Sequence, residues 1–289
     1  MTIQQLSQEI GIGIDTLRIW ERRYGFPIPS RDARGHRSYS WKQIEELRVV
    51  KNLQVFGQRP GKIFSLTPSQ RLELLDKLVV RNLPQDRGLQ RLIYELNPQQ
   101  IATEMDGQRE SLGLESFIHA FAVPLLQLLD HGWSAGKVSI AREHLISDQL
   151  ERLLKAVFSL QAAVGHPQIL FLTLSGERHK LGLLLAAASF YSAGVSCIWL
   201  NEELPLSEIP GLAKELAVDG VALSFSAHFS PRQAKQDLSS LRKNLDQKIK
   251  LIAGGHAVRK IPSLPNLLVC TNLQQIPQLV VRHFFKPKP

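Results

Sequence analysis

The second half of the chain alternates short apolar runs with helical segments, and this alternation limits the possible folds more than any other feature. Five runs are continuously apolar, as are strands that are covered on both faces. The runs are 168–174, 195–201, 220–226, 249–255 and 267–272. Strands that are joined by helical crossovers run parallel. We therefore predict a flavodoxin-like (Rossmann-type) α/β domain with a five-stranded parallel sheet, which binds ligands beyond the carboxyl ends of its strands.

Two capping boxes mark helix starts in the N-terminal segment. In Thr2-x-x-Gln5 and in Ser40-x-x-Gln43, a hydroxyl and an amide can satisfy each other's backbone donors at a helix start. We therefore predict helices that begin directly after Thr2 and Ser40, and we expect the second of them to end at Gly57.

A further helix and a hairpin are predicted between these two starts. Gly11 fits the end of the first helix, and Asp15 fits the N-cap of the next one. This next helix has apolar residues at roughly helical spacing, namely Leu17, Ile19, Trp20 and Tyr24. The segment 27–39, PIPSRDARGHRSY, is rich in Pro, Gly and Arg and predicts a small hairpin wing. We expect both Trp20 and Trp41 to lie in the core.

Helical patterns continue from about residue 67 to residue 163 and predict an up-and-down helical bundle. We therefore divide the chain into a winged helix-turn-helix domain (1–75), a helical bundle (76–163) and the sheet domain (164–289). The N-terminus has no secretory pattern, and no stretch reaches the ~18 apolar residues of a membrane span. We expect a cytoplasmic, multidomain α and α/β protein that does not bind a membrane.

The chain carries a formal net charge of +9, which favours a polyanionic partner. Residues 1–62 contain eleven basic and six acidic side chains, so this short segment holds +5 of the total. The positive charge is therefore concentrated where the helix-turn-helix pattern lies. On charge alone, an ordinary three-helix domain with a solvated basic face is the open alternative.

The order of residues in this basic segment is informative. LSQEIGIGIDTLRIWERRYG, followed by GHRSYS, resembles the DNA-binding head of MerR-type regulators. The resemblance implies that Arg18 and Arg22 on the second helix contact double-stranded DNA in the major groove. It implies further DNA contacts from Arg37 and Tyr39 on the wing.

The first loop at the carboxyl edge of the predicted sheet contains the motif Glu177-x-His179-x-x-Gly182. An imidazole in this loop can reach a ligand, and the carboxylate two residues earlier can accept its Nδ1 proton. Such a bond makes Nε2 the better metal ligand. Gly182 would allow a large flat cofactor to approach the backbone. On this motif alone, a hydrogen-bonded surface histidine is the open alternative.

Two further motifs end the third and fourth strands at the same edge, SFS (224–226) and GG (254–255). With the histidine loop they resemble the cobalamin-binding fold, which carries D-x-H-x-x-G, S-x-L and GG motifs. The resemblance implies that His179 is the lower axial ligand of cobalt and that Glu177 orients it. It also implies cofactor contacts at Gly182, Ser224, Gly254 and Gly255. The chain departs from the motifs in two places, because Glu177 replaces Asp and Ser226 replaces Leu.

The segment 131–145, HGWSAGKVSIAREHL, pairs Trp133 with Glu143 and His144. This spacing resembles the W-x9-E-H signature of CarH/LitR-type photoreceptors, which join a MerR-type head to a cobalamin-binding tail. The resemblance implies that Trp133 covers the upper face of adenosylcobalamin and that Glu143 and His144 lie near the adenosyl group. A core tryptophan beside a solvated Glu-His pair is the alternative. Ser134 stands where well-known members of the family have a histidine that ligates cobalt after illumination.

Together these features predict a transcriptional repressor, and not an enzyme, that adenosylcobalamin controls and that light can switch through the cobalt–carbon bond. A homo-oligomer, either a dimer or a tetramer, would bring paired heads to repeated half-sites. One alternative is a MerR-type regulator whose cobalamin fold has lost its cofactor and acts through protein contacts. A corrinoid enzyme is the other, but the chain shows no substrate domain and such an enzyme has no use for a basic helix-turn-helix.

Overall fold

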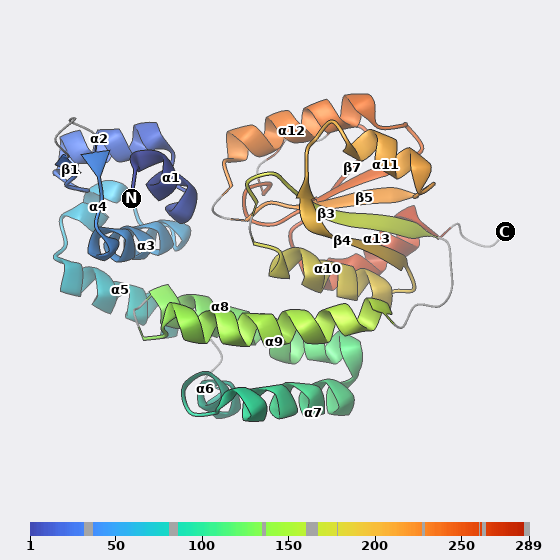
Figure 1. Ribbon diagram of the computed structural model, residues 1–289, viewed down its shortest axis with the longest axis horizontal. Coiled ribbons are helices and arrows are strands. Elements are labelled where there is room, and N and C mark those ends of the chain that lie inside the picture. Colours follow the sequence, from blue (N-terminus) through green and yellow to red (C-terminus); the bar gives the residue numbers. More distant parts are fainter. Residues whose placement is uncertain are drawn as a thin grey trace. The chain divides into compact units, whose positions relative to one another are not determined.

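The computed structural model describes residues 1–31, 37–80, 86–134, 137–159, 167–177, 179–226, 229–259, 261 and 264–285. By its internal contacts the chain divides into two compact units (Figure 1). The first unit comprises residues 1–101 and 123–146, and the second comprises residues 102–122 and 147–289. The helices that we predict as one bundle therefore divide between the units, and the predicted boundary after residue 163 lies outside the described residues.

The N-terminal part of the first unit, residues 1–66, is here called the head. It contains α1 (Ile3–Ile10), α2 (Ile14–Tyr24), β1 (Ser30–Arg31), β2 (Arg37–Ser38), α3 (Trp41–Val55) and α4 (Pro60–Phe64). The strands β1 and β2 pair antiparallel, as expected of a wing, and the tip of this hairpin lies outside the described residues. A shared apolar core holds these helices together, with Leu6, Leu17, Trp20, Ile44 and Leu47 among its fully or almost fully buried side chains.

The first two helices of the head begin differently from one another. Thr2 and Gln5 form the complete capping box that we predict. The helix α1 ends at Gly11, which has the left-handed conformation expected of a helix end. The prediction that Asp15 is the N-cap of α2 is wrong, because α2 follows Gly13 and Asp15 lies in its first turn. An acidic residue in a first turn still interacts favourably with the helix dipole.

The two tryptophans of the head differ in burial. Trp20 is 3% exposed and belongs to the core, as predicted. The prediction that Trp41 lies in the core is wrong, because 61% of this residue is exposed. Helical side chains lean toward the N-terminus of their helix. At the first position of α3, Trp41 therefore points past the end of the helix and away from the core.

Six further elements connect the head to the sheet. They are α5 (Pro68–Val80), α6 (Arg87–Tyr94), α7 (Pro98–Ser116), the π-helical turn η1 (Phe117–Ala122), α8 (Val123–Ser134) and α9 (Ile140–Ser159). The helical stretch 98–133 is long and apolar enough to cross a membrane, whereas the sequence predicts no such stretch. A non-helical residue at Gly113 and the π-helical turn interrupt it. Within it, the side chains of Phe117, Ile118 and Leu125 are fully buried in the protein.

The second unit contains the predicted parallel sheet of five strands. The strands are β3 (Gln168–Leu174), β4 (Ser196–Leu204), β5 (Gly220–Ser224), β6 (Lys250–Gly254) and β7 (Leu267–Cys270). Every neighbouring pair is parallel, and the order across the sheet is β4-β3-β5-β6-β7, which is the flavodoxin order. Between and after these strands lie the helices α10 (Leu181–Ser192), α11 (Ile209–Glu215), α12 (Pro231–Asn244) and α13 (Ile276–His283), the last preceded by the short turn η2 (Leu273–Gln275).

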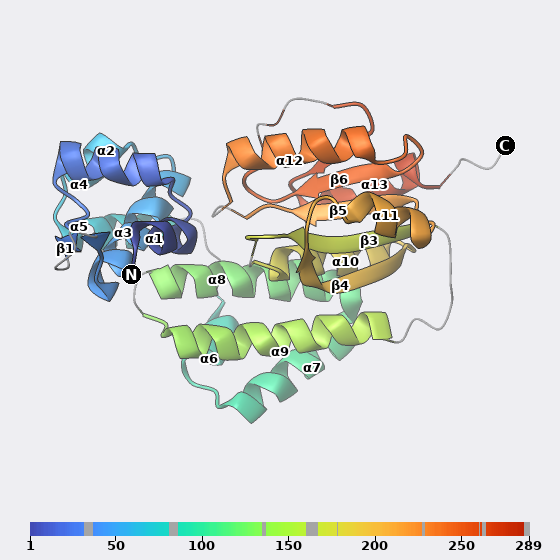
Figure 2. The ribbon, with the colours of Figure 1, turned by 45° about the horizontal axis from the view of Figure 1, so that its top comes forward.

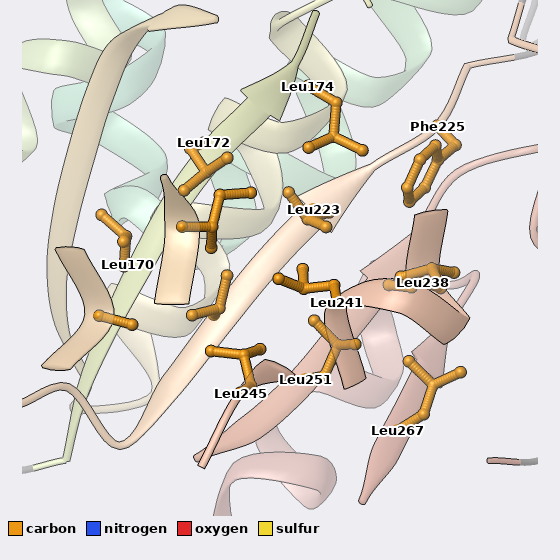
Figure 3. Packing of buried hydrophobic residues seen from close by; sticks show 14 of the residues in the cluster. Leu170, Leu172, Leu174, Leu223, Phe225, Leu238, Leu241, Leu245, Leu251 and Leu267 are labelled. Atoms are coloured by element: carbon orange, nitrogen blue, oxygen red, sulfur yellow. The ribbon is translucent and has the colours of Figure 1, made fainter. Parts of the chain in front are cut away.

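Helices cover both faces of this sheet (Figures 1 and 2). On one face, Leu170 and Leu172 of β3 pack with residues of α11 and α12, and Figure 3 shows part of this cluster. On the other face, Ile169 and Phe171 pack with residues of α10 and α13. Alternate residues of β3 thus enter two different cores, which explains why the strand is apolar throughout.

Candidate nucleic-acid interface and ligand site

The helix α2 carries the basic residues of the candidate interface in the head. Arg18 and Arg22 are exposed, and Arg18 lies 3.8 Å from Asp15 in a solvated ion pair. Exposed pairs of this kind contribute little to stability. Both guanidinium groups are therefore able to leave their positions for a phosphate or a base edge.

Ion pairing and burial connect the wing to α2. The Nε atom of Arg37 lies 3.4 Å from a carboxylate oxygen of Glu21 on α2. Tyr39 follows the wing and is only 4% exposed, and its hydroxyl has no hydrogen-bond partner among the described residues. Burial and the nearby Glu21 raise the pKa of Tyr39, whereas Arg37, Arg18 and Arg31 oppose this shift. Arginines of α2 and of the wing thus surround one buried phenol, and a DNA contact by Tyr39 itself stays a prediction.

The side chain of Gln43 binds the backbone just before the wing, a contact that no sequence pattern indicates. Ser40 caps α3 by accepting from the Gln43 N–H, but the Gln43 side chain does not return to Ser40. Its amide instead binds both backbone groups of Ile28, accepting from the N–H at 2.9 Å and donating to the carbonyl at 2.8 Å. The second predicted capping box is therefore only half formed. The Gln43 side chain, which would complete it, instead holds Ile28 in the segment that leads into the wing.

The ligand-site candidates of the sheet lie at its carboxyl edge, where the loop after β3 holds Glu177 and His179. Glu177 is 1% exposed. One of its carboxylate oxygens accepts from the backbone N–H of His179 at 2.9 Å and lies 3.0 Å from Nδ1 of the same residue. Its other oxygen accepts from the Ser226 N–H at 2.7 Å. Burial alone would raise the pKa of the Glu177 carboxyl, but these hydrogen bonds outweigh it and hold the pKa below its ordinary value.

These bonds determine how the imidazole is presented. An ionised carboxylate is only an acceptor, so Nδ1 of His179 carries the proton that faces Glu177. In the neutral imidazole Nε2 is then the nitrogen with a lone pair, and the side chain of His179 is 52% exposed. The arrangement is the one that supports metal ligation by a histidine. Among the described residues no group of three or more His, Cys, Asp or Glu side chains could hold a metal ion.

Glu203 at the end of β4 holds the same loop from the other side. Its carboxylate accepts from the Gly176 N–H at 2.8 Å. The register between β3 and β4 shifts, because Trp199 pairs with Phe171 whereas Glu203 pairs with Thr173. This irregularity brings Glu203 to the loop. No motif in the sequence indicates it.

A cavity of about 190 Å³ opens between the sheet and α10 and is lined by Gly182, Ser224, Gly254 and Gly255. Neither Glu177 nor His179 lines it, although Ser226, which bonds Glu177, follows closely after Ser224. Gly255 has a φ of +92°, and a Cβ atom there would lie 2.2 Å from the carbonyl oxygen of Phe225. At Gly254 a Cβ would lie 3.0 Å from the carbonyl oxygen of Cys270. At position 255, therefore, the backbone conformation and the neighbouring Phe225 backbone both exclude any residue with a Cβ atom.

The remaining candidates, Trp133, Glu143 and His144, belong to the first unit. Nδ1 of His144 lies 2.6 Å from Glu143, and the His144 side chain is 70% exposed. Trp133 is the second-last residue of α8. Its ring stacks with Arg48 of α3, whose guanidinium carbon lies 4.0 Å from the ring centroid. The nearby His131 pairs its Nε2 with Asp76 at 3.5 Å, and burial lowers its pKa while Asp76 opposes this shift.

Comparison with known proteins defines the class first. Residues 1–66 match the MerR HTH family regulatory protein model. The head is thus a MerR-type helix-turn-helix domain.

Two relatives from Myxococcus xanthus then extend the likeness beyond the head. The HTH-type transcriptional repressor CarA is 28% identical over 239 residues, which are 81% of this chain and 79% of CarA. The HTH-type transcriptional repressor CarH is 26% identical over 258 residues, or 86% of either chain. The chain is homologous to both repressors. Among solved structures, a cobalamin-binding protein from Desulfitobacterium hafniense DCB-2 covers 67% of this chain and 95% of its own, at 18% identity and a TM-score of 0.32.

Proposed function

We propose that the chain is a transcriptional repressor whose sheet domain binds cobalamin, in its adenosyl form, and that light relieves the repression. The observation that carries the proposal is the carboxyl edge of the sheet, where a buried carboxylate orients His179 beside a glycine-lined cavity. As a relative of transcriptional repressors, the protein is expected to be soluble and to act in the cytoplasm.

The residues at this edge fit the cofactor on three counts. The Glu177 side chain, although longer than the usual Asp, reaches Nδ1 of His179 at 3.0 Å and so favours ligation through Nε2. The cavity of about 190 Å³ is smaller than the ~300–1,000 Å³ of pockets for whole drug-sized ligands, and would hold only the nucleotide tail. Gly254 and Gly255 keep the backbone beside it free of side chains.

Adenosylcobalamin supplies a cobalt with exchangeable axial positions and a cobalt–carbon bond that light can break. His179 would hold the cobalt through Nε2, and Glu177 would keep its Nδ1 protonated. Gly182, Ser224, Gly254 and Gly255 would hold the tail. We further propose that Trp133, with Glu143 and His144, contacts the upper face of the cofactor.

The residues after Trp133 bear on the response to light. Serine is a poor cobalt ligand, and this residue type stands at position 134. His131 is no evident substitute, because its Nε2 pairs with Asp76. We therefore propose that light acts by removing the adenosyl group, without a protein side chain taking its place.

DNA binding would use the exposed Arg18 and Arg22 on α2 and Arg37 on the wing, with Tyr39 supporting them from the core or contacting DNA itself. A single small head makes few base contacts, and tight specific binding then requires two heads on repeated half-sites. We propose that the cofactor-bound form is a homo-oligomer, a dimer or a tetramer.

The test is the visible spectrum of the full-length protein after incubation with adenosylcobalamin in the dark and desalting. We expect the wild type to keep corrin absorbance and His179→Ala to lose most of it. His283→Ala, which removes a histidine of α13 from the same unit, is the matched control and should bind like the wild type. A wild type that keeps no absorbance would instead favour the alternative in which the fold acts through protein contacts alone. A gel shift of the loaded protein in the dark and in green light then tests the switch, and equal retardation would contradict it.

A further inference from the structure

A second, larger cavity lies in the first unit beside Trp133. Its volume is about 660 Å³, within the ~300–1,000 Å³ that small-molecule pockets occupy. The walls come from α3 of the head, from α5, and from the end of α8 with the start of α9. Apolar side chains such as Val49, Leu72 and Ile140 line it together with the indole of Trp133. The DNA-binding head thus provides one wall of a ligand-sized pocket.

Arg48 of α3 lies over one face of Trp133 in this cavity. Its guanidinium carbon is 4.0 Å from the ring centroid, and the residue is only 6% exposed. A guanidinium with little hydration is attracted strongly by the face of an aromatic ring. At this separation the two groups are in contact, so no other planar group can stack on the same face at the same time.

The backbone around Trp133 restricts how far the indole can move away. Gly132 accepts hydrogen bonds from the N–H groups of Lys137 and Val138 at 2.8 and 2.9 Å. A Cβ atom at Gly132 would lie 2.5 Å from a methyl group of Val138, so the chain turns tightly at this point. The arginine, at the end of a flexible side chain, is therefore the partner that can leave.

We propose that Arg48 and a flat ligand compete for this face of Trp133, so that a ligand in the cavity releases α3 of the head from α8. The inference rests on the proposed function, in which the ligand is the upper part of adenosylcobalamin. Coupling of this kind is reciprocal. The contact between Arg48 and Trp133 weakens ligand binding, and the ligand weakens the contact, which connects the cofactor directly to the helix that follows the wing.

The test measures the affinity of full-length Arg48→Met for adenosylcobalamin in the dark, by equilibrium dialysis and visible absorbance. Methionine keeps a long apolar side chain and removes the charge, a change that buried ionic sites often tolerate. We expect binding that is about 3- to 30-fold tighter than that of the wild type, the range of a desolvated cation–π contact. Lys42→Met is the matched control, because Lys42 is an exposed cation on the same cavity, and it should change the affinity by less than about twofold.

Each outcome has a separate meaning. A wild type that binds, with an Arg48→Met variant that binds equally or more weakly, would overturn the competition and leave the proposed function standing. Failure of both proteins to bind would overturn the proposed function, and the competition with it. If the variant does not fold, amide hydrogen exchange of the wild type tests whether the ligand loosens α3. We expect the cofactor to accelerate amide exchange at residues 45–52 of α3, and slower or unchanged exchange there would contradict the proposal.

Discussion

The sheet edge and the head both surround a buried polar group with charged or polar neighbours, but they satisfy that group differently. At the sheet edge the Glu177 carboxylate receives bonds from two backbone N–H groups and from the His179 ring. In the head the Tyr39 hydroxyl is buried, is surrounded by charges, and has no hydrogen-bond partner among the described residues. Buried polar groups without partners are rare and costly in native proteins.

This difference shows that the two sites are organised to different degrees before any ligand is present. The Glu177 carboxylate already directs the imidazole, so the sheet edge can bind a ligand without rearranging its backbone. Near Tyr39, Arg18 pairs at 3.8 Å with the exposed Asp15 and the half-buried Arg37 pairs at 3.4 Å with Glu21, and long ion pairs of this kind can rearrange on binding DNA. Substitutions at the sheet edge should therefore affect stability strongly, and those at the head surface should affect it little.

The largest effect is expected for Gly255→Ala. The new methyl group would collide with the backbone of Phe225, and alanine disfavours the φ of +92°. Strain and overpacking together should lower the free energy of unfolding by about 2–4 kcal/mol, measured by urea denaturation. Gly176→Ala is the matched control, because Gly176 has a φ of +91° but no atom within 4 Å of the new methyl group. An equal loss in both variants would show that the tight packing at position 255 does not matter.

A smaller effect that depends on pH is expected for Glu177→Gln. The amide cannot accept from three donors as a carboxylate does, so the variant should lose about 1–3 kcal/mol of unfolding free energy at pH 7. The pKa of Glu177 is lowered in the folded protein, so the carboxylate stabilises the fold fully above the ordinary carboxyl pKa of about 4.3. This stabilisation is lost as the pH falls from that value through the folded-state pKa. Urea unfolding in steps from pH 7 down to about pH 3 should show the wild type and variant converging at the acid end, and a constant difference would argue against an organised carboxylate.

The same contrast explains which positions can be predicted from the sequence. Parallel strands share one carboxyl edge, so the motifs that follow the strands could be placed together from chain order alone. Gly255 could be assigned because the GG pair at the end of a strand resembles a motif of the cobalamin-binding fold. Glu203 could not, since it reaches Gly176 only through the register shift between β3 and β4.

In the head, the sequence does not predict burial well at the ends of short elements. Tyr39, which is predicted to contact DNA, is only 4% exposed, whereas Trp41 is predicted as a core residue and is exposed. Both lie within two residues of Ser40, where the wing ends and α3 begins. Hydrophobic periodicity does not apply across such a junction, so burial there depends on the neighbouring elements. The periodic interior of α2, by contrast, places Leu17 and Trp20 correctly.

The smallest effect on stability is expected for Tyr39→Phe. Its buried hydroxyl makes no hydrogen bond among the described residues, so replacing it by hydrogen loses no bond and should leave the free energy of unfolding unchanged or raise it by at most about 1 kcal/mol. DNA affinity, measured by gel shift at fixed salt, separates the two possible roles of this residue. If Tyr39 only packs the core, Tyr39→Phe should bind like the wild type, whereas Arg22→Ala should bind more weakly because an exposed basic contact is removed. Weaker DNA binding by Tyr39→Phe at unchanged stability would show that the phenol reaches the DNA, and that the head rearranges more on binding than the sheet edge does.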